Sequence, residues 1–263
     1  IDDVLAYAAD AATQLESITH SDQQAEALKA EIALLLTEIG ELSGKLSARR
    51  IEAAYRLAEA VESELAELAM EATTFKVGVS QVTSEDGLSV ASEDGSGVQY
   101  SFDATGIDHV ELLLSPGPGE PFHPLAATAS GGEASRLMLA IKGVLAAADQ
   151  TPTLVFDEVD AGIGGRVGTV VGDKTWRLSA NHQGVCVTHL PQIAAFADHH
   201  VHIEKSVVNG RTVTSTRAIF SDDIVEELSQ MLGSTSTITR RHAEEMLEQT
   251  IRWKNAAAKT KGL

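Results

Sequence analysis

Two adjacent carboxylates follow a short apolar run in the middle of the chain. The run 153–156 ends directly in Asp157 and Glu158. An aspartate in such a place can serve Mg²⁺, usually through water, and a glutamate beside it can polarise a water that attacks a phosphate. The end of an ordinary apolar strand followed by a helix cap would have the same sequence pattern, so the two carboxylates indicate a site only together with the motifs around them.

A second stretch that could do chemistry is Ser130-Gly131-Gly132-Glu133. With Ser130 as N-cap and Glu133 three residues later, it can be an ordinary capping box. Two glycines are not needed for capping, and each weakens a first helical turn by about 1 kcal/mol. They indicate a backbone that something must approach closely, and exposed N–H groups beside a hydroxyl at a helix start form a phosphate cradle.

A histidine, His189, follows the next apolar strand, at 184–188. A lone histidine after a strand is often a core residue, but its place one strand after the two carboxylates favours a contact with a γ-phosphate. The sequence contains no Gly-x-x-x-x-Gly-Lys-Ser/Thr loop to cradle the β- and γ-phosphates. The motifs therefore predict half of an ATP-hydrolysing site, and we expect this chain alone to be inactive.

The elements around these motifs predict an α/β fold. A strand, a helix and a strand over 153–188 imply a parallel crossover, in which ligands bind at the carboxyl ends of the strands. Alternating apolar residues between 75 and 114 predict a small antiparallel sheet, and Asn209-Gly210 predicts a hairpin. Helices are expected near 222–232 and 237–254.

The first part of the chain has the apolar spacing of a coiled coil. The seam runs from Leu28 to Phe75 with spacings of four and three, which predicts a helical arm over 1–74 beside a lobe at 75–263. Ser21 and Gln24 form a capping-box pattern that predicts a break near 19–22. No later segment has matching heptads, so the partner helix lies outside this chain or on another copy.

Charge and composition restrict the range of functions that this chain can have. The 38 acidic and 20 basic side chains give a net charge of −18, which opposes a large surface that grips nucleic acid by charge. The single cysteine, Cys186, cannot form an intrachain disulfide and suits a reducing cytoplasm. No apolar run is long enough to cross a bilayer. The Gly- and Pro-rich loop at 115–121 has no predicted task.

Taken together, the motifs resemble the C-terminal lobe of an ATP-binding-cassette head of the SMC type. Within that group, the stretches 129–136, 156–165 and 187–194 resemble the bacterial RecN family of DNA double-strand-break repair ATPases. In such heads a long coiled coil separates an N-terminal lobe, which carries the Walker A loop, from the C-terminal lobe. The resemblance covers essentially the whole chain and explains both the absent loop and the absent coil partner.

The resemblance implies roles for the residues of the motifs, with ATP and Mg²⁺ as ligands. It implies that the signature residues contact ATP held by a second head, and that a Walker B strand, a D-loop and a switch histidine complete the site. The implied roles are Ser130, Gly131, Gly132 and Glu133 for the signature, Asp157 for Mg²⁺, Glu158 for the attacking water, Asp160 for the dimer-spanning D-loop and His189 for the γ-phosphate.

The resemblance also implies partners and a location. The partners are the protein's own N-terminal Walker A lobe and ascending coil, a second copy through ATP-engaged heads, and DNA in the full-length protein, without a membrane. The location would be cytoplasmic and nucleoid-associated. Two alternatives stay open. One is a transporter-type ATPase subunit, against which the long heptad helix argues. The other is a structural coiled-coil module with an inactive head, against which the joint presence of Asp157, Glu158 and His189 argues.

Overall fold

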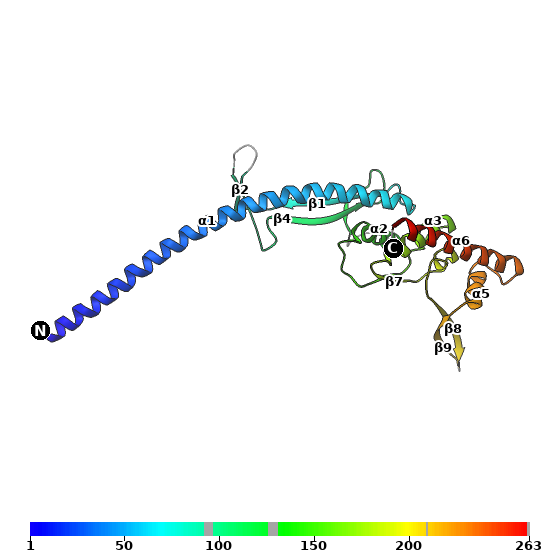
Figure 1. Ribbon diagram of the computed structural model, residues 1–263. Coiled ribbons are helices and arrows are strands. Elements are labelled where there is room, and N and C mark those ends of the chain that lie inside the picture. Colours follow the sequence, from blue (N-terminus) through cyan, green and yellow to red (C-terminus); the bar gives the residue numbers. More distant parts are fainter. Residues whose placement is uncertain (92–96, 126–130, 209, 262–263) are drawn as a thin grey trace. The chain divides into compact units, whose positions relative to one another are not determined.

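The computed structural model describes residues 1–91, 97–125, 131–208 and 210–261. The chain forms two compact units, one of residues 1–56 and 77–111 and the other of residues 57–76 and 112–263. These units do not follow the division at 74/75, and the arm and lobe boundaries stay a prediction. Helices and strands are mixed and a long helix comes first (Figure 1), so the expected α/β class with a helical arm is confirmed.

The first element is one continuous helix, α1 (Asp2–Glu67). The break expected near 19–22 is wrong, because α1 continues through these residues. Ser21 is exposed inside the helix, where serine costs only a few tenths of a kcal/mol, and no glycine or proline precedes Gly40. The helix ends before 74. Ala69 takes a left-handed φ of 57°, and the amide of Met70 donates to the carbonyl of Leu65 at 3.1 Å, which is a Schellman stop.

In the unit of residues 1–56 and 77–111, α1 packs against a hairpin. The hairpin consists of β2 (Thr83–Ala91) and β3 (Gly97–Tyr100), paired antiparallel. Its buried core is Leu88, Val90 and Ile107. Gly40 is required where α1 meets β2, because a Cβ there would collide with the carbonyl oxygen of Ser89.

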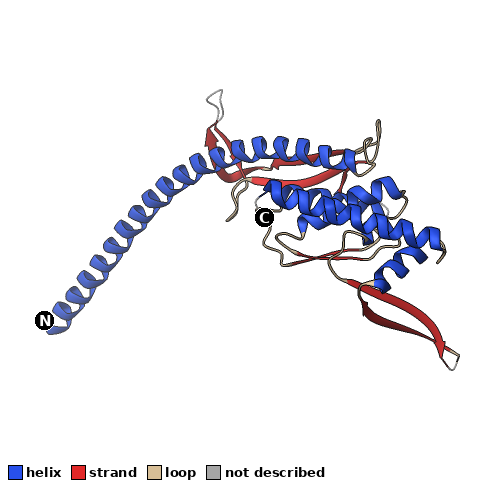
Figure 2. Ribbon diagram, turned by 45° about the vertical axis from the view of Figure 1, so that its right-hand side comes forward, coloured by secondary structure: helices blue, strands red, loops and turns tan. Residues whose placement is uncertain are grey.

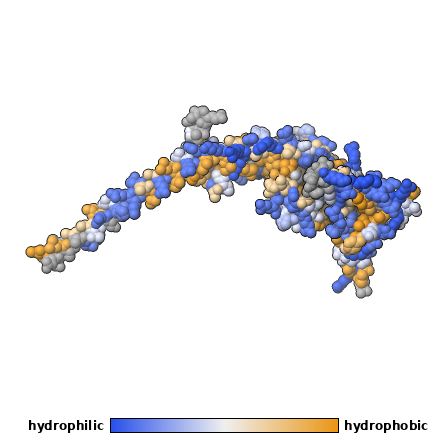
Figure 3. Space-filling view, viewed as in Figure 1, coloured by the Kyte–Doolittle hydropathy of each residue, from blue (hydrophilic) through white to orange (hydrophobic). Residues whose placement is uncertain are grey.

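The apolar seam of α1 is open to solvent over much of its length. Figure 3 shows hydrophobic side chains, in orange, along this helix. Each of its seam residues between 28 and 46 exposes more than a third of its surface: Leu28, Ile32, Leu35, Ile39, Leu42 and Leu46. This exposure is what a coiled-coil seam without its partner helix should show.

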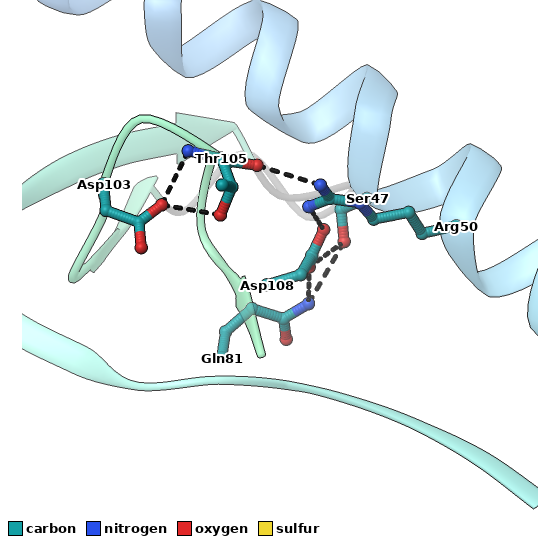
Figure 4. A network of polar contacts seen from close by, with 6 residues as sticks. All are labelled: Ser47, Arg50, Gln81, Asp103, Thr105 and Asp108. Atoms are coloured by element: carbon teal, nitrogen blue, oxygen red, sulfur yellow. Dashed lines mark hydrogen bonds and ion pairs between the residues drawn. The ribbon is translucent and has the colours of Figure 1, made fainter. Parts of the chain in front are cut away.

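A buried carboxylate fixes α1 to the strands of the same unit (Figure 4). The side chain of Asp108 is fully buried and accepts hydrogen bonds from Ser47 Oγ at 2.7 Å, Gln81 Nε2 at 2.7 Å and Arg50 Nη1 at 3.0 Å. Burial alone would raise the pKa of Asp108, but these donors outweigh it and hold the pKa below its usual range. The network therefore stabilises the ionised form at neutral pH.

The other unit, of residues 57–76 and 112–263, contains the parallel crossover (Figure 2). β6 (Thr153–Phe156) pairs in parallel with β7 (Gln183–Cys186), and the helix between them is α3 (Gly165–Leu178). The predicted crossover is confirmed. The hairpin predicted at Asn209-Gly210 is also confirmed through its strands, with Gly210 at a φ of 74°, while Asn209 itself lies outside the described residues.

The remaining elements complete the topology. β1 (Thr74–Gln81), β4 (Asp108–Ser115) and β5 (His123–Pro124) form a three-stranded sheet in the order β1-β4-β5. The others are α2 (Gly131–Leu145), α4 (Pro191–Ala194), β8 (His200–Val208), β9 (Arg211–Ile219), α5 (Asp222–Met231) and α6 (Thr237–Lys261). Among the described residues, no helix has the length and apolar character needed to cross a membrane.

Candidate active site

The two carboxylates lie just beyond the end of β6. Phe156 is buried at the end of the strand, and Asp157 and Glu158 are both exposed. Glu158 has a left-handed φ of 56°. A non-glycine residue in this region costs on the order of 1–3 kcal/mol and persists only where its surroundings hold it, so the strain marks Glu158 as a site candidate.

The first turn of α2 lies against the segment that carries these carboxylates. A Cβ added at Gly131 would collide with the Glu158 carboxylate. A Cβ at Gly132 would lie 2.7 Å from Ala161 Cβ and 3.0 Å from the Glu158 carbonyl oxygen. We predicted that something must approach these glycines closely, and at Gly132, which is buried, the chain itself does so. Gly131 is exposed.

Two side chains one turn further along α2 reach the same segment. Ser135 Oγ donates to the carbonyl of Asp157 at 2.6 Å. Arg136 Nη1 donates to the carbonyl of Ala161 at 2.7 Å and, at 3.4 Å, to that of Val159. Burial lowers the pKa of Arg136 from its usual value, opposed by the charge of Glu133. The α2 turn and the segment 157–161 are thus joined through side-chain to backbone bonds.

Asp160 connects this segment to the residues after β7. Its side chain is only 5% exposed and its Oδ2 accepts from Thr188 Oγ1 at 2.5 Å and from the backbone amide of His189 at 2.8 Å. His189 Nδ1 lies 3.0 Å from the same oxygen, while the imidazole is 73% exposed. Burial would raise the pKa of Asp160, but the hydrogen bonds hold it below its usual range. Asp160 therefore orients His189 and leaves Nε2 available for a ligand.

The cysteine of β7 is not a nucleophile. Burial raises the pKa of Cys186 to about 12, with smaller contributions from the charges of Asp160 and Asp157. A thiol of this kind is almost entirely protonated at neutral pH, so Cys186 belongs to the packing of β7.

The structure brings several of the predicted site residues together. Glu158 lies beside Gly131, and Asp160 lies beside His189. The Asp157 carbonyl is bound to α2 and its exposed carboxylate is left for a ligand. Ser130 lies outside the described residues, so its capping and signature roles stay predictions.

Sequence reasoning did not assign roles to Ser135, Arg136 or Thr188. A signal was present for the first two. They follow Gly131 and Gly132 by four residues, and residues at i and i+4 share a helix face. Side chains at these positions must face whatever the glycines face. Thr188 offered no comparable signal, because its bond to Asp160 joins residues that are far apart in sequence.

The donor set suits a magnesium–nucleotide complex better than an all-protein metal site. The described part of the chain holds no group of three or more His, Cys, Asp and Glu side chains that could hold a metal ion. Mg²⁺ bound with a nucleotide takes one or two carboxylates and fills its other positions with water and phosphate oxygens. Asp157 and Glu158, exposed beside an exposed glycine at a helix N-terminus, fit that chemistry.

Comparison with known proteins gives a consistent set of relatives. No family model matches the chain. The chain is 36% identical over 250 residues to DNA repair protein RecN of Halalkalibacterium halodurans, covering 94% of this chain and 42% of that protein. It is 42% identical to RecN of Streptomyces coelicolor, over 83% of this chain and 38% of that protein. RecN of Mycobacterium tuberculosis is 39% identical, and the match covers 94% of this chain and 43% of that protein.

Among solved structures, the Smc head domain with an extended coiled coil from Pyrococcus furiosus, bound to the C-terminal domain of ScpA, is similar to this chain. The similarity covers 73% of this chain and 42% of that chain, at 20% identity and a TM-score of 0.43. The chain belongs to the RecN family of DNA repair proteins and spans about two fifths of the length of these relatives, a span consistent with their C-terminal half.

Proposed function

We propose that this chain supplies half of a composite ATP-hydrolysing site in a DNA repair ATPase. The observation that carries the proposal is the convergence of Glu158, Gly131 and the Asp160–His189 pair beyond the ends of β6 and β7. Exposed carboxylates, an exposed helix start and an oriented imidazole are among the groups that phosphoryl transfer to water uses. The relatives are DNA repair proteins, which supports repair as the cellular process.

The proposal assigns a role to each residue of the motifs. Asp157 holds Mg²⁺, which would neutralise charge on the phosphates when bound, and Glu158 polarises the attacking water. His189, oriented by Asp160, contacts the γ-phosphate through Nε2. The signature turn, with Ser130, Gly131, Gly132 and Glu133, contacts ATP held by a second head. The role of Asp160 as a dimer-spanning D-loop residue belongs to the same proposal, in addition to its hold on His189.

The missing parts of the site come from partners. We assign the Walker A loop to an N-terminal lobe of the full-length protein and the exposed seam of α1 to the ascending coil. Two such heads would dimerise around ATP and separate after hydrolysis, and the full-length protein would act on DNA double-strand breaks in the cytoplasm, at the nucleoid. With a net charge of −18, this chain is a poor DNA-binding surface, and we place the DNA contacts on the other parts.

Replacing Glu158 by Gln tests this proposal in the full-length protein. The variant should bind ATP, hold heads together longer than wild type and lose turnover, because the amide cannot polarise the water. Arg241→Ala, an exposed position on α6, is the control and should leave both properties unchanged. Unchanged turnover and dimerisation in Glu158→Gln would favour the alternative, a structural coiled-coil module with an inactive head.

A further inference from the structure

The segment from Asp157 to Ala161 has every backbone carbonyl bonded. The carbonyl of Glu158 accepts from the amide of Ala161 at 3.0 Å, and that of Asp160 accepts from the amide of Ile163 at 3.4 Å. The other carbonyls, of Asp157, Val159 and Ala161, accept from side chains of α2. Local backbone turns therefore satisfy only part of the segment, and α2 fixes the rest.

The bonds from α2 fall on both sides of the strained residue. Ser135 holds the carbonyl that precedes Glu158, and Arg136 holds the carbonyl of Val159 that follows it. The peptide group before Glu158 is held by Ser135, and the one after it by the bond from the Ala161 amide to the Glu158 carbonyl, in a turn that Arg136 anchors at Val159 and Ala161. Glu158 therefore keeps its left-handed φ of 56° although that conformation is unfavourable by itself. Its carboxylate is thereby directed to the space beside Gly131, at the start of α2.

The arginine is unusual for the inside of a protein. Arg136 is 6% exposed and forms no ion pair with any carboxylate among the described residues. Its Nε has no hydrogen-bond partner there either. A buried cation that forms no ion pair is costly, although the charge of Glu133 offsets part of that cost. A hydrophobic side chain of similar size would fill the same space with less loss of free energy. What a hydrophobic side chain cannot do is donate hydrogen bonds to the carbonyls of Val159 and Ala161.

We infer that Arg136 and Ser135 are positioning residues, which hold the Glu158 carboxylate in place for hydrolysis by fixing the backbone on either side of it. This inference rests on the proposed function, because it assumes that Glu158 polarises the attacking water. It adds a consequence for a dimer of heads. The helix whose first turn contacts ATP on the second head donates hydrogen bonds to the backbone of the segment whose carboxylates act on ATP in the first, so the two composite sites are mechanically linked.

The test compares Arg136→Ala, Arg136→Lys and Ser135→Ala in the full-length protein, with Arg252→Ala as the control. Arg252 is two-thirds exposed, and its one ion pair within the described part of the chain is with Glu248 on its own helix. Displacement of a catalytic group by about 1 Å can lower a rate on the order of a hundredfold. We expect kcat to fall at least about tenfold in each Arg136 variant and severalfold in Ser135→Ala, with the KM for ATP within about twofold of wild type. Ser135→Thr, which keeps the hydroxyl, should restore turnover.

Guanidinium ion separates positioning from a merely structural role. At millimolar concentration it should restore part of the kcat of Arg136→Ala by binding where the lost side chain bonded the carbonyls, whereas a variant that had only lost stability would not recover in a denaturant. If wild type hydrolyses ATP and Ser135→Ala keeps the wild-type kcat, or if guanidinium restores nothing to Arg136→Ala, the inference is overturned. If the wild-type full-length protein itself does not hydrolyse ATP, the proposed function fails instead.

Discussion

Two neighbouring glycines should respond in opposite directions to replacement by alanine. Neither Gly131 nor Gly132 has a positive φ, so alanine fits the backbone at both positions and should stabilise the chain by about 0.4–1 kcal/mol through the unfolded state. At Gly131 the new Cβ meets the end of the Glu158 carboxylate, which is exposed and can rotate away. We therefore expect Gly131→Ala to be neutral or slightly stabilising.

At Gly132 the neighbours cannot move in this way. The new Cβ would meet Ala161 Cβ at 2.7 Å and the Glu158 carbonyl oxygen at 3.0 Å, in a segment bonded to α2 at both ends. Overpacking of this kind costs about 1–3 kcal/mol, which exceeds the gain from the unfolded state. Because that gain is common to both variants, Gly132→Ala should be less stable than Gly131→Ala by about 1–3 kcal/mol.

Urea unfolding followed by tryptophan fluorescence measures this difference. The sequence has two tryptophans, Trp176 and Trp253, and both lie in the unit that contains the two glycines. The variants should differ in the midpoint of unfolding and share one slope. Equal midpoints, or a Gly132→Ala variant more stable than wild type, would refute the claim that the segment 158–161 makes Gly132 necessary.

Three other perturbations follow from the same contacts. Lys174→Met should lower the free energy of unfolding by about 1–3 kcal/mol in the same urea assay, because the partly buried Glu64 carboxylate loses its ion pair. The exposed control, Arg241→Ala, should change the free energy of unfolding by less than about 0.5 kcal/mol. Since the pKa of Asp108 is lowered by folding, its contribution is present at neutral pH and is lost as the pH falls below about 4. Asp108→Asn should remove it at pH 7, seen as faster hydrogen exchange across β2 and β3, and an unchanged exchange rate would count against the network. With its pKa raised to about 12, Cys186 should resist iodoacetamide at pH 8 in the folded chain and react fully in urea, and equal rates in both would contradict its burial.

Most of the fold could be predicted from local sequence patterns. The strand 153–156, the crossover and the hairpin at Asn209-Gly210 each depend on residues close in sequence, and the structure confirms them. The break near 19–22 was wrong for the same local reason. A capping box is only a preference, and in α1 it competes with a long run of good helix formers that contains no glycine or proline before Gly40.

Less of the candidate site could be predicted from the sequence alone. Strand ends predicted where Asp157, Glu158 and His189 lie, because the topology of a parallel sheet brings such residues to one edge. The left-handed backbone of Glu158 and the buried donors of Arg136 could not be predicted, since both depend on how α2 packs against a segment more than twenty residues away. The bond between Thr188 and Asp160 is of the same long-range kind.

ATP turnover tests the central claim most directly. It would be measured for this chain alone and again after addition of a separately expressed N-terminal lobe that carries a Walker A loop, with Glu158→Gln as the matched inactive variant. The account predicts no turnover by the chain alone, turnover by the mixture, and none by the mixture that contains Glu158→Gln. A mixture that neither hydrolyses ATP nor associates in its presence would contradict the account and leave the chain as a structural coiled-coil module.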